Sequence, residues 1–174
     1  MIIRALGASN AEAYRALMLE ASSMLEAYGA YPEAFTSSVA ERARMPLSWW
    51  EKRLDNPLDQ LLGAFEGEVL AGIVGLAFEP REKARHKVTL FGMYVNGAYQ
   101  QKGLGRQLVE AALAEARKHP RLQVIQLTVT AGNDAAFALY QRCGFIQYDL
   151  EPLAVRVGEE YFDKIHMWRE LNAD

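Results

Sequence analysis

The chain has 174 residues and a mass of 19.5 kDa, which is the size of one domain, and we expect a single domain over residues 1–174. Its 19 Lys and Arg and 22 Asp and Glu leave a formal net charge of −3, so no general attraction to nucleic acid or to an anionic membrane is expected. Its one cysteine, Cys143, excludes an intrachain disulfide and a cysteine-built metal cage. We expect a cytoplasmic protein without a signal peptide or membrane anchor, because the longest uncharged apolar run, Val69 to Phe78, is far shorter than the roughly 18–20 residues of a membrane span.

The first third of the chain predicts a strand, a helix and an irregular segment. A short strand is expected over Met1 to Leu6, followed by a helix that Ser9 or Asn10 caps and that Gly29 and Pro32 end. The helix is predicted from apolar side chains at helical spacing, namely Tyr14, Leu17, Met18, Ala21 and Leu25.

The segment from Tyr31 to Asn56 is expected to begin irregularly and then to form a short helix from about Pro46, with Ser48 as a cap candidate. The apolar face of this helix is formed by Trp49, Trp50 and Leu54. We interpret the segment as a cover over a binding cleft.

Three strands and a helix are predicted next. Gln60 to Glu66 and Val69 to Glu79 form a hairpin around Gly67, and a third strand runs from His86 to Val95. The helix that follows ends before Pro120 and is predicted from Leu104, Leu108, Val109, Ala112, Leu113 and Ala116.

The rest of the chain continues this alternation. A strand over Leu122 to Thr130 precedes a helix that Asn133 caps and that ends at Arg142. Gly144 is expected as its left-handed terminator, and Phe145 starts another strand. The chain closes with a hairpin of Ala154–Val157 and Tyr161–Trp168, joined at Gly158-Glu159-Glu160. This order predicts a mixed sheet packed by helices.

The turn from Val95 into the helix at Leu104 has the character of an anion site. Gly103 and Gly105 allow close approach of a ligand to the backbone, and the helix start offers unpaired N–H groups and partial positive charge. Lys102 and Arg106 add formal charge. A P-loop and a dinucleotide fingerprint are both ruled out, because the required residues are missing. A glycine pair that merely starts a helix is an equally good interpretation of this segment alone.

A second informative segment runs from Asn133 to Phe145. On a helix, Ala136 and Tyr140 lie one turn apart, with Phe137 beside them and Asn133 at the cap. That edge can line a narrow cleft. Taken alone, the same side chains are equally consistent with an ordinary core stripe.

Together, in this order and separation, the two segments resemble the GNAT superfamily of acetyl-CoA-dependent N-acetyltransferases. The motif [RQ]-x-x-G-x-[GA] is matched by Gln100, Gly103 and Gly105. The later motif N-x-x-A-x-x-L-Y-x-x-x-G-F is matched by Asn133, Ala136, Leu139, Tyr140, Gly144 and Phe145. The resemblance covers about residues 60 to 150 in its motifs and the whole chain in its order of elements.

This resemblance implies an α/β (mixed α+β) fold: a central mixed, mostly antiparallel twisted sheet of about seven strands, flanked by about four helices. The strand ending at Val95 would splay from the strand Leu122 to Thr130 and open a V-shaped gap for acetyl-CoA, without a metal. The residues implied to bind the cofactor are Met93, Tyr94, Val95, Gln100, Gln101, Lys102, Gly103, Leu104, Gly105, Arg106, Asn133, Ala136, Phe137 and Tyr140.

The implied reaction is transfer of the acetyl group to a primary amine by direct attack in a ternary complex. Tyr140 is the candidate catalytic residue, donating a hydrogen bond to the departing thiolate. A direct general base is in doubt, because the strand segment Val88 to Met93 lacks the glutamate that many family members carry there. Glu33, Glu79, Glu151 and His166 remain conceivable through a water but are more typical of solvated or structural positions.

Selection of the acceptor is expected from the segment Tyr28 to Asn56. Three glutamates in and just before it, Glu26, Glu33 and Glu41, alternate with aromatic residues, which would suit a cationic amine, although such aromatics equally often pack inward. The aromatic residues are Tyr28, Tyr31, Phe35, Trp49 and Trp50. The sequence leaves open whether the acceptor is a small molecule or a protein amine, and whether the last strands pair with a second copy as a homodimer. A non-catalytic acyl-CoA-binding module is the main alternative, and a nucleotide-binding oxidoreductase is the weaker one.

Overall fold

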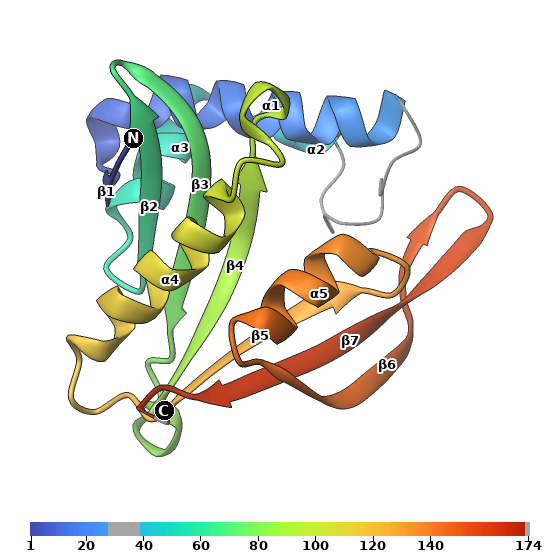
Figure 1. The fold of residues 1–174 in the computed structure, drawn as a ribbon. Helices are drawn as coiled ribbons and strands as arrows, with labels where there is room; N and C mark the ends of the chain where they lie inside the picture. Colours follow the sequence, from blue (N-terminus) through green and yellow to red (C-terminus); the bar gives the residue numbers. More distant parts are fainter. Residues whose placement is uncertain (28–38, 173–174) are drawn as a thin grey trace.

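The computed structural model describes residues 1–27 and 39–172. Seven strands form one sheet in the order β1-β2-β3-β4-β5-β7-β6 (Figure 1). Neighbouring strands are antiparallel except β4 and β5, which are parallel. The strands are β1 (Ile2–Ala5), β2 (Asp59–Glu66), β3 (Val69–Phe78), β4 (Lys87–Val95), β5 (Val124–Thr130), β6 (Ile146–Val157) and β7 (Glu160–Glu170). The mixed, mostly antiparallel sheet predicted from the sequence is confirmed.

Five α-helices lie against this sheet in the described residues (Figure 1). They are α1 (Ala11–Ala27), α2 (Val39–Ala43), α3 (Leu47–Asp55), α4 (Leu104–Arg117) and α5 (Asp134–Arg142), with three short 3-10 turns at Ala8–Asn10, Glu82–Ala84 and Gly97–Tyr99. None of the described helices combines the length and the apolar character that a bilayer crossing requires.

The sheet separates two hydrophobic cores. Helix α4 buries its apolar stripe, including Leu108, in the larger core, together with Tyr140 of α5. Helices α1 and α3 build the smaller core on the other side, around Tyr14 and Trp50. Neighbouring residues of β2, such as Leu61 and Leu62, belong to different cores. Both faces of β2 and β3 are therefore buried, which explains why the sequences of these strands are continuous apolar runs.

Strands β4 and β5 pair at three positions only, from Lys87 opposite Val124 to Thr89 opposite Gln126. Beyond Thr89 the two strands diverge, which gives the V-shaped opening visible in Figure 1. The register between β3 and β4 shifts between Ile73 and Gly75, so β4 carries one extra residue there, beside Gly92 with its φ of +61°. A bulge of this kind bends a strand, and the predicted splay is confirmed.

The first third departs from the prediction in detail. Asn10 ends a 3-10 turn and accepts a hydrogen bond from the Gly7 N–H at 3.0 Å. A short helix, α2, lies in the stretch expected to be irregular. Pro46, not Ser48, is the cap residue of α3, because the fixed φ of proline suits a helix start. The predicted terminators Gly29 and Pro32 lie outside the described residues.

The two strands expected after Phe145 are a single strand, β6, interrupted by register shifts at Gln147/Asp149 and Glu151/Val155. Leu153, within the second irregularity, adopts a φ of +52°. These irregularities, and Pro152 in the second of them, are accommodated because β6 is the edge of the sheet. The termination of α5 by Gly144, at a φ of +89°, is confirmed.

The larger core leads to a prediction about stability. Leu108 is fully buried, and a Cβ placed on Gly72 would lie 2.9 Å from one of its methyl groups, so α4 packs closely on β3. We expect Leu108→Ala to lower the free energy of unfolding by about 2–5 kcal/mol, through lost burial and a residual cavity. Urea unfolding measures this loss. The exposed neighbour Gln107 is the control, since Gln107→Ala should change the value by less than about 0.5 kcal/mol; equal effects would contradict the packing described.

Candidate active site

A cavity of about 800 Å³ occupies the splay between β4 and β5. One end is lined by β4, the turn into α4, and residues of β5 and α5. The other end is lined by side chains of α1, α2 and α3, including Tyr14, Trp49 and Trp50. The cavity therefore connects the predicted anion site with the segment that was interpreted as a cover.

Most of the residues that the resemblance implied for the cofactor line this cavity. They are Met93, Tyr94, Val95, Gln100, Gln101, Gly103, Leu104, Gly105, Asn133, Ala136 and Tyr140. Residues 93 to 105 and 133 to 140 are far apart in the sequence, and the fold brings them to the two sides of one opening.

The turn before α4 is fixed by local contacts. Gln100 donates a side-chain hydrogen bond to the Val95 carbonyl at 2.9 Å. Gln101 and Gly103 adopt left-handed φ values of +61° and +79°, which folds the backbone into a tight turn at the helix start. The first N–H groups of a helix have no partner within the helix, so α4 presents donors and the positive end of its dipole to the cavity.

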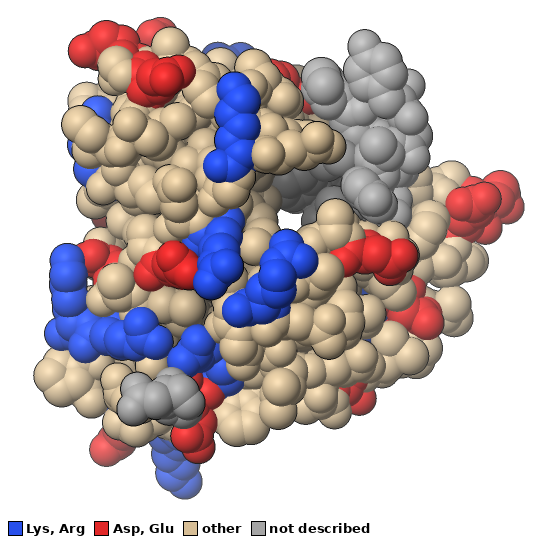
Figure 2. Space-filling view, in the orientation of Figure 1, with Lys and Arg blue, Asp and Glu red and all other residues tan. Residues whose placement is uncertain are grey.

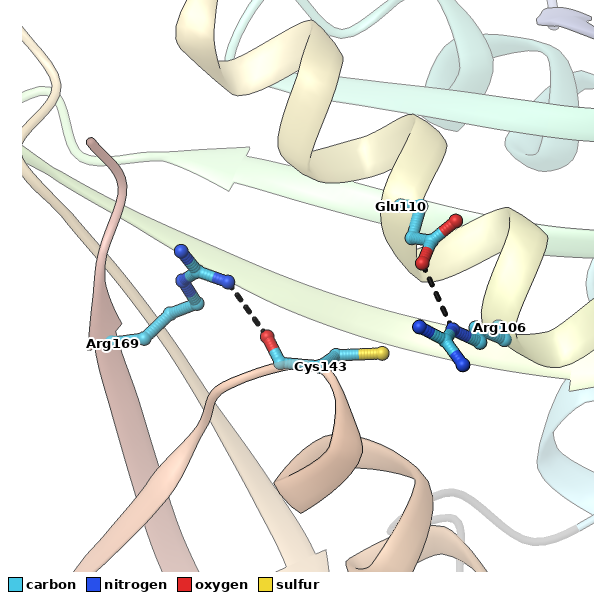
Figure 3. Close-up of polar contacts among 4 residues, drawn as sticks. All are labelled: Arg106, Glu110, Cys143 and Arg169. Carbon is cyan, nitrogen blue, oxygen red and sulfur yellow. Dashed lines mark hydrogen bonds and ion pairs between the residues drawn. The ribbon is translucent and has the colours of Figure 1, made fainter. Parts of the chain in front are cut away.

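Three of the implied residues lie outside the cavity wall. Lys102 places its ammonium 5.7 Å from the ring centre of Tyr99. Arg106 turns to Glu110, with Nε 2.9 Å from the carboxylate oxygen (Figure 3). Phe137 packs against the larger core. Both side chains of the Arg106–Glu110 pair are more than half exposed, and such pairs add little stability.

Lys and Arg side chains gather along the surface where α4 and α5 lie side by side (Figure 2). A second hollow of about 440 Å³ in this region is lined by Arg117, Arg142 and Arg169. Arg169 also donates a hydrogen bond to the Cys143 carbonyl at 2.7 Å (Figure 3). Glu110 also lines this hollow, so three arginines and one carboxylate meet there, in a chain whose net charge is negative.

Helix α5 begins as the sequence predicted. The Asn133 side chain accepts a hydrogen bond from the Ala136 N–H at 3.4 Å and caps the helix. One turn later Tyr140 reaches the cavity, although it is only 7% exposed. Its ring packs edge-on against Phe145, with 5.9 Å between ring centres. Burial raises the pKa of the Tyr140 phenol, so the hydroxyl stays protonated and available as a donor.

Several cavity residues escaped the sequence analysis. On β5, Thr128, Val129 and Thr130 line the cavity at the opening left by the splay. Their position depends on how β4 and β5, which are distant in the sequence, diverge, and no local sequence pattern predicts this divergence. Arg53 also lines the cavity, and for this residue a signal exists. It follows Trp49 and Trp50 at the i+4 and i+3 positions of one helix and therefore shares their face.

At the end of the cavity lined by α1 to α3, the charged side chains of the described residues are cations, whereas the sequence suggested carboxylates. Arg42 and Arg53 line the cavity, and no Asp, Glu or His of the described residues does so. Burial, and to a smaller degree the charge of Arg53, lowers the pKa of Arg42. Glu41 is exposed, and Glu33 lies outside the described residues.

A model of the Acetyltransferase (GNAT) family matches residues 22–145. The chain is 34% identical to N-alpha-acetyltransferase RimI of Mycobacterium tuberculosis over 114 residues, which are 65% of this chain and 68% of that protein. It is 28% identical to the L-amino acid N-acetyltransferase AaaT of Escherichia coli over 142 residues, which are 80% of this chain and 86% of that protein.

Solved structures show the same fold. A GNAT-family acetyltransferase from Streptococcus pneumoniae superposes with a TM-score of 0.83 at 26% identity, covering 97% of this chain and 98% of that chain. The structure of yncA from Salmonella typhimurium, with its cofactor acetyl-CoA, superposes with a TM-score of 0.77 at 22% identity, covering 100% of this chain and 95% of that chain.

Proposed function

Since the chain belongs to the GNAT acetyltransferase family, we propose that the cavity in the splay binds acetyl-CoA and a primary amine together and transfers the acetyl group by direct attack. The observation that carries this proposal is the continuous cavity joining the turn before α4, the Tyr140 phenol and the walls of α1 to α3. N-acetyltransferases of this family use acetyl-CoA. The proposal therefore concerns which residues of this chain bind the cofactor and catalyse the transfer.

The turn before α4 is proposed to hold the pyrophosphate. Backbone N–H groups from Gln101 to Gly105 are the donors, and the helix dipole favours the negative charge. The positive surface between α4 and α5 strengthens the attraction of an anionic cofactor. Lys102 and Arg106 contribute to this attraction by their positive charge and not by direct contact, since their side chains lie outside the cavity wall.

The edge of β4 beyond Thr89 has no strand partner on the β5 side. Unpaired backbone groups of Met93 to Val95 are therefore proposed to pair with the amides of the pantetheine arm and with the thioester oxygen. A donor aimed at that oxygen stabilises the tetrahedral intermediate. The acceptor nitrogen bonds to the carbonyl carbon, the carbon–sulfur bond breaks, and CoA leaves as a thiolate.

Tyr140 is proposed to stabilise that thiolate. Full proton transfer from a phenol of pKa ~10 to a thiolate of pKa ~8.5 is uphill by about 2 kcal/mol, and burial raises the pKa of Tyr140 further. A hydrogen bond to the developing charge avoids this cost. Tyr140 then acts as a donor and not as a complete general acid.

The amine must be neutral to attack. No carboxylate or imidazole of the described residues lines the cavity, so we propose that the proton leaves through water. Positive side chains disfavour a second positive charge nearby. The lining cations Arg42, Arg53 and Lys164 therefore lower the pKa of a bound ammonium, which lessens the need for a strong base.

The proposal is tested by titrating acetyl-CoA and then following thiol release with a panel of amines. We expect binding in the ordinary range of about 1 μM to 1 mM and release of thiol only when an amine is present. Binding without turnover of any amine would indicate a non-catalytic acyl-CoA module. Incubation with acetyl-CoA alone should leave the protein mass unchanged; an acetylated protein would contradict direct attack.

We also propose a homodimer, formed through the edge strand β6. Its 12 residues end the sheet, and Ile146, Tyr148 and Leu150 on it are each 46% to 56% exposed. Long apolar edges are usually paired or protected. We expect Leu150→Lys to shift the protein to a monomer in sedimentation equilibrium, while the wild type remains dimeric. A wild-type monomer at micromolar concentration would contradict this.

A cytoplasmic setting suits this activity. Cys143 is a free, buried thiol, and single thiols persist in reducing compartments.

A further inference from the structure

The charged side chains lining the cavity among the described residues are Arg42, Arg53 and Lys164, all cations. Arg42 and Arg53 stand at the acceptor end, beside Tyr14, Trp49 and Trp50. We infer that the acceptor is a small amine that also carries a carboxylate or similar oxyanion, as a free amino acid does, and that the oxyanion binds at Arg53. This inference rests on the proposed function and adds the acceptor class.

Arg53 is positioned to receive an oxyanion. Its Nε donates to the Tyr14 hydroxyl at 3.2 Å, and its guanidinium carbon lies 5.3 Å from the ring centre of Phe91. No ion pair within 4.0 Å joins it to a carboxylate of the described residues. Burial raises the pKa of Asp59, and the positive charge of Arg53 opposes this rise. Asp59 does not line the cavity. The guanidinium is thus fixed in place with terminal N–H donors available for bidentate binding.

Trp50 supplies a second, independent observation. Its side chain is 1% exposed, and its indole Nε1 has no hydrogen-bond partner among the described residues. Buried indole N–H groups usually find a partner, and an unsatisfied buried donor is costly. The ring is held by edge contacts to Tyr14 and Trp49. Because Trp50 lines the cavity beside Arg53, an acceptor oxyanion is a suitable partner for this donor.

The charge of Arg53 also disfavours other acceptors. A polyamine would add positive charge beside Arg53, and no carboxylate of the described residues lines the cavity to compensate it. The aromatic walls at Trp49 and Phe91 fit an apolar or aromatic body attached to the amino and acid groups.

The test compares free α-amino acids with their amides, which keep the amine and the side chain and lose the carboxylate. Spermidine and short peptides complete the panel. We expect kcat/KM to be at least about 10-fold higher for the acid of the preferred pair, although the amine of an amide is more easily deprotonated. A hydrogen bond to a charged group is worth about 10- to 100-fold in affinity.

Three variants test which residues cause the preference for the acid over the amide. Arg53→Gln should reduce the acid-to-amide ratio about 10- to 100-fold and leave the KM of acetyl-CoA unchanged. Trp50→Phe, which keeps an aromatic ring and removes the N–H, should reduce the ratio by a smaller factor. Lys52→Gln is the matched control, because Lys52 is the exposed neighbour on the same helix, and it should leave the ratio unchanged. General damage to the fold would lower both rates together and not their ratio.

The outcomes separate the inference from the proposed function. Absence of acetyl-CoA binding, or of turnover with every amine, would overturn the proposed function and the inference with it. Turnover that is equal or faster with amides, fastest with spermidine, or confined to peptides would overturn the inference alone. An acid preference that survives Arg53→Gln would do the same.

Discussion

Replacing Tyr140 with phenylalanine should lower kcat about 10- to 100-fold while changing the affinity for acetyl-CoA less than about threefold. The phenol is 7% exposed and lines the cavity, so the substitution removes one donor and keeps the ring packing against Phe145. A hydrogen bond to a charged group contributes about 1.5–3 kcal/mol, and the thiolate charge exists only late in the reaction. The loss should therefore appear in kcat and not in binding.

Two measurements make the Tyr140 prediction decisive. Steady-state kinetics with the preferred amine gives kcat, and an equilibrium titration gives the affinity for acetyl-CoA. Phe137→Leu serves as the control, because Phe137 lies on the same helix but packs into the core away from the cavity; its kcat should change far less. Unchanged kcat in Tyr140→Phe would remove Tyr140 from the mechanism.

Replacing Gly103 with aspartate should weaken acetyl-CoA binding about 10- to 100-fold. Gly103 adopts a φ of +79°, and a Cβ at this position would meet nothing within 4 Å. Asp and Asn tolerate the left-handed region better than other side chains. The new carboxylate would stand where the pyrophosphate is proposed to bind, and like charges facing each other oppose binding. Solvent at this exposed position limits the effect.

The matched control for this variant is Gly103→Asn, which has nearly the same shape and no charge. Its affinity for acetyl-CoA, measured by calorimetry, should lie much closer to that of the wild type. High salt should narrow the gap between the two variants, because screening weakens the repulsion. Equal affinities for Asp and Asn at low salt would mean that the pyrophosphate does not bind at this turn.

The fold could be predicted from the sequence wherever local signals agreed with tertiary structure. The amphipathic stripe of α4, the cap at Asn133 and the terminator at Gly144 are all local patterns, and each is confirmed. The start of α3 near Pro46 was predicted, but Ser48 was the wrong cap residue. The single strand β6 was missed, because the pairing of an irregular edge strand depends on its neighbour β7.

The end of the cavity that is proposed to bind acetyl-CoA could be located from the sequence, because two sequence motifs line it. The end that is proposed to bind the acceptor could not, because its walls come from separate elements, α1, α2 and α3, that meet only in the folded chain. Glutamates near aromatic residues suggested a cation site, yet Glu41 is exposed and Arg42 beside it lines the cavity. Neighbours on a helix point in different directions, so composition alone could not say which of these charged side chains reaches the cavity.

The separation of the two cores by the sheet affects how this protein can diversify. Acetyl-CoA is proposed to be held mainly by elements packed in the larger core, whereas α1 and α3, which pack in the smaller one, form much of the acceptor wall. Substitutions that share no contacts tend to have independent effects. If these roles hold, mutations in α1 and α3 can accumulate during evolution and alter which amine is accepted, while the cofactor chemistry is inherited unchanged.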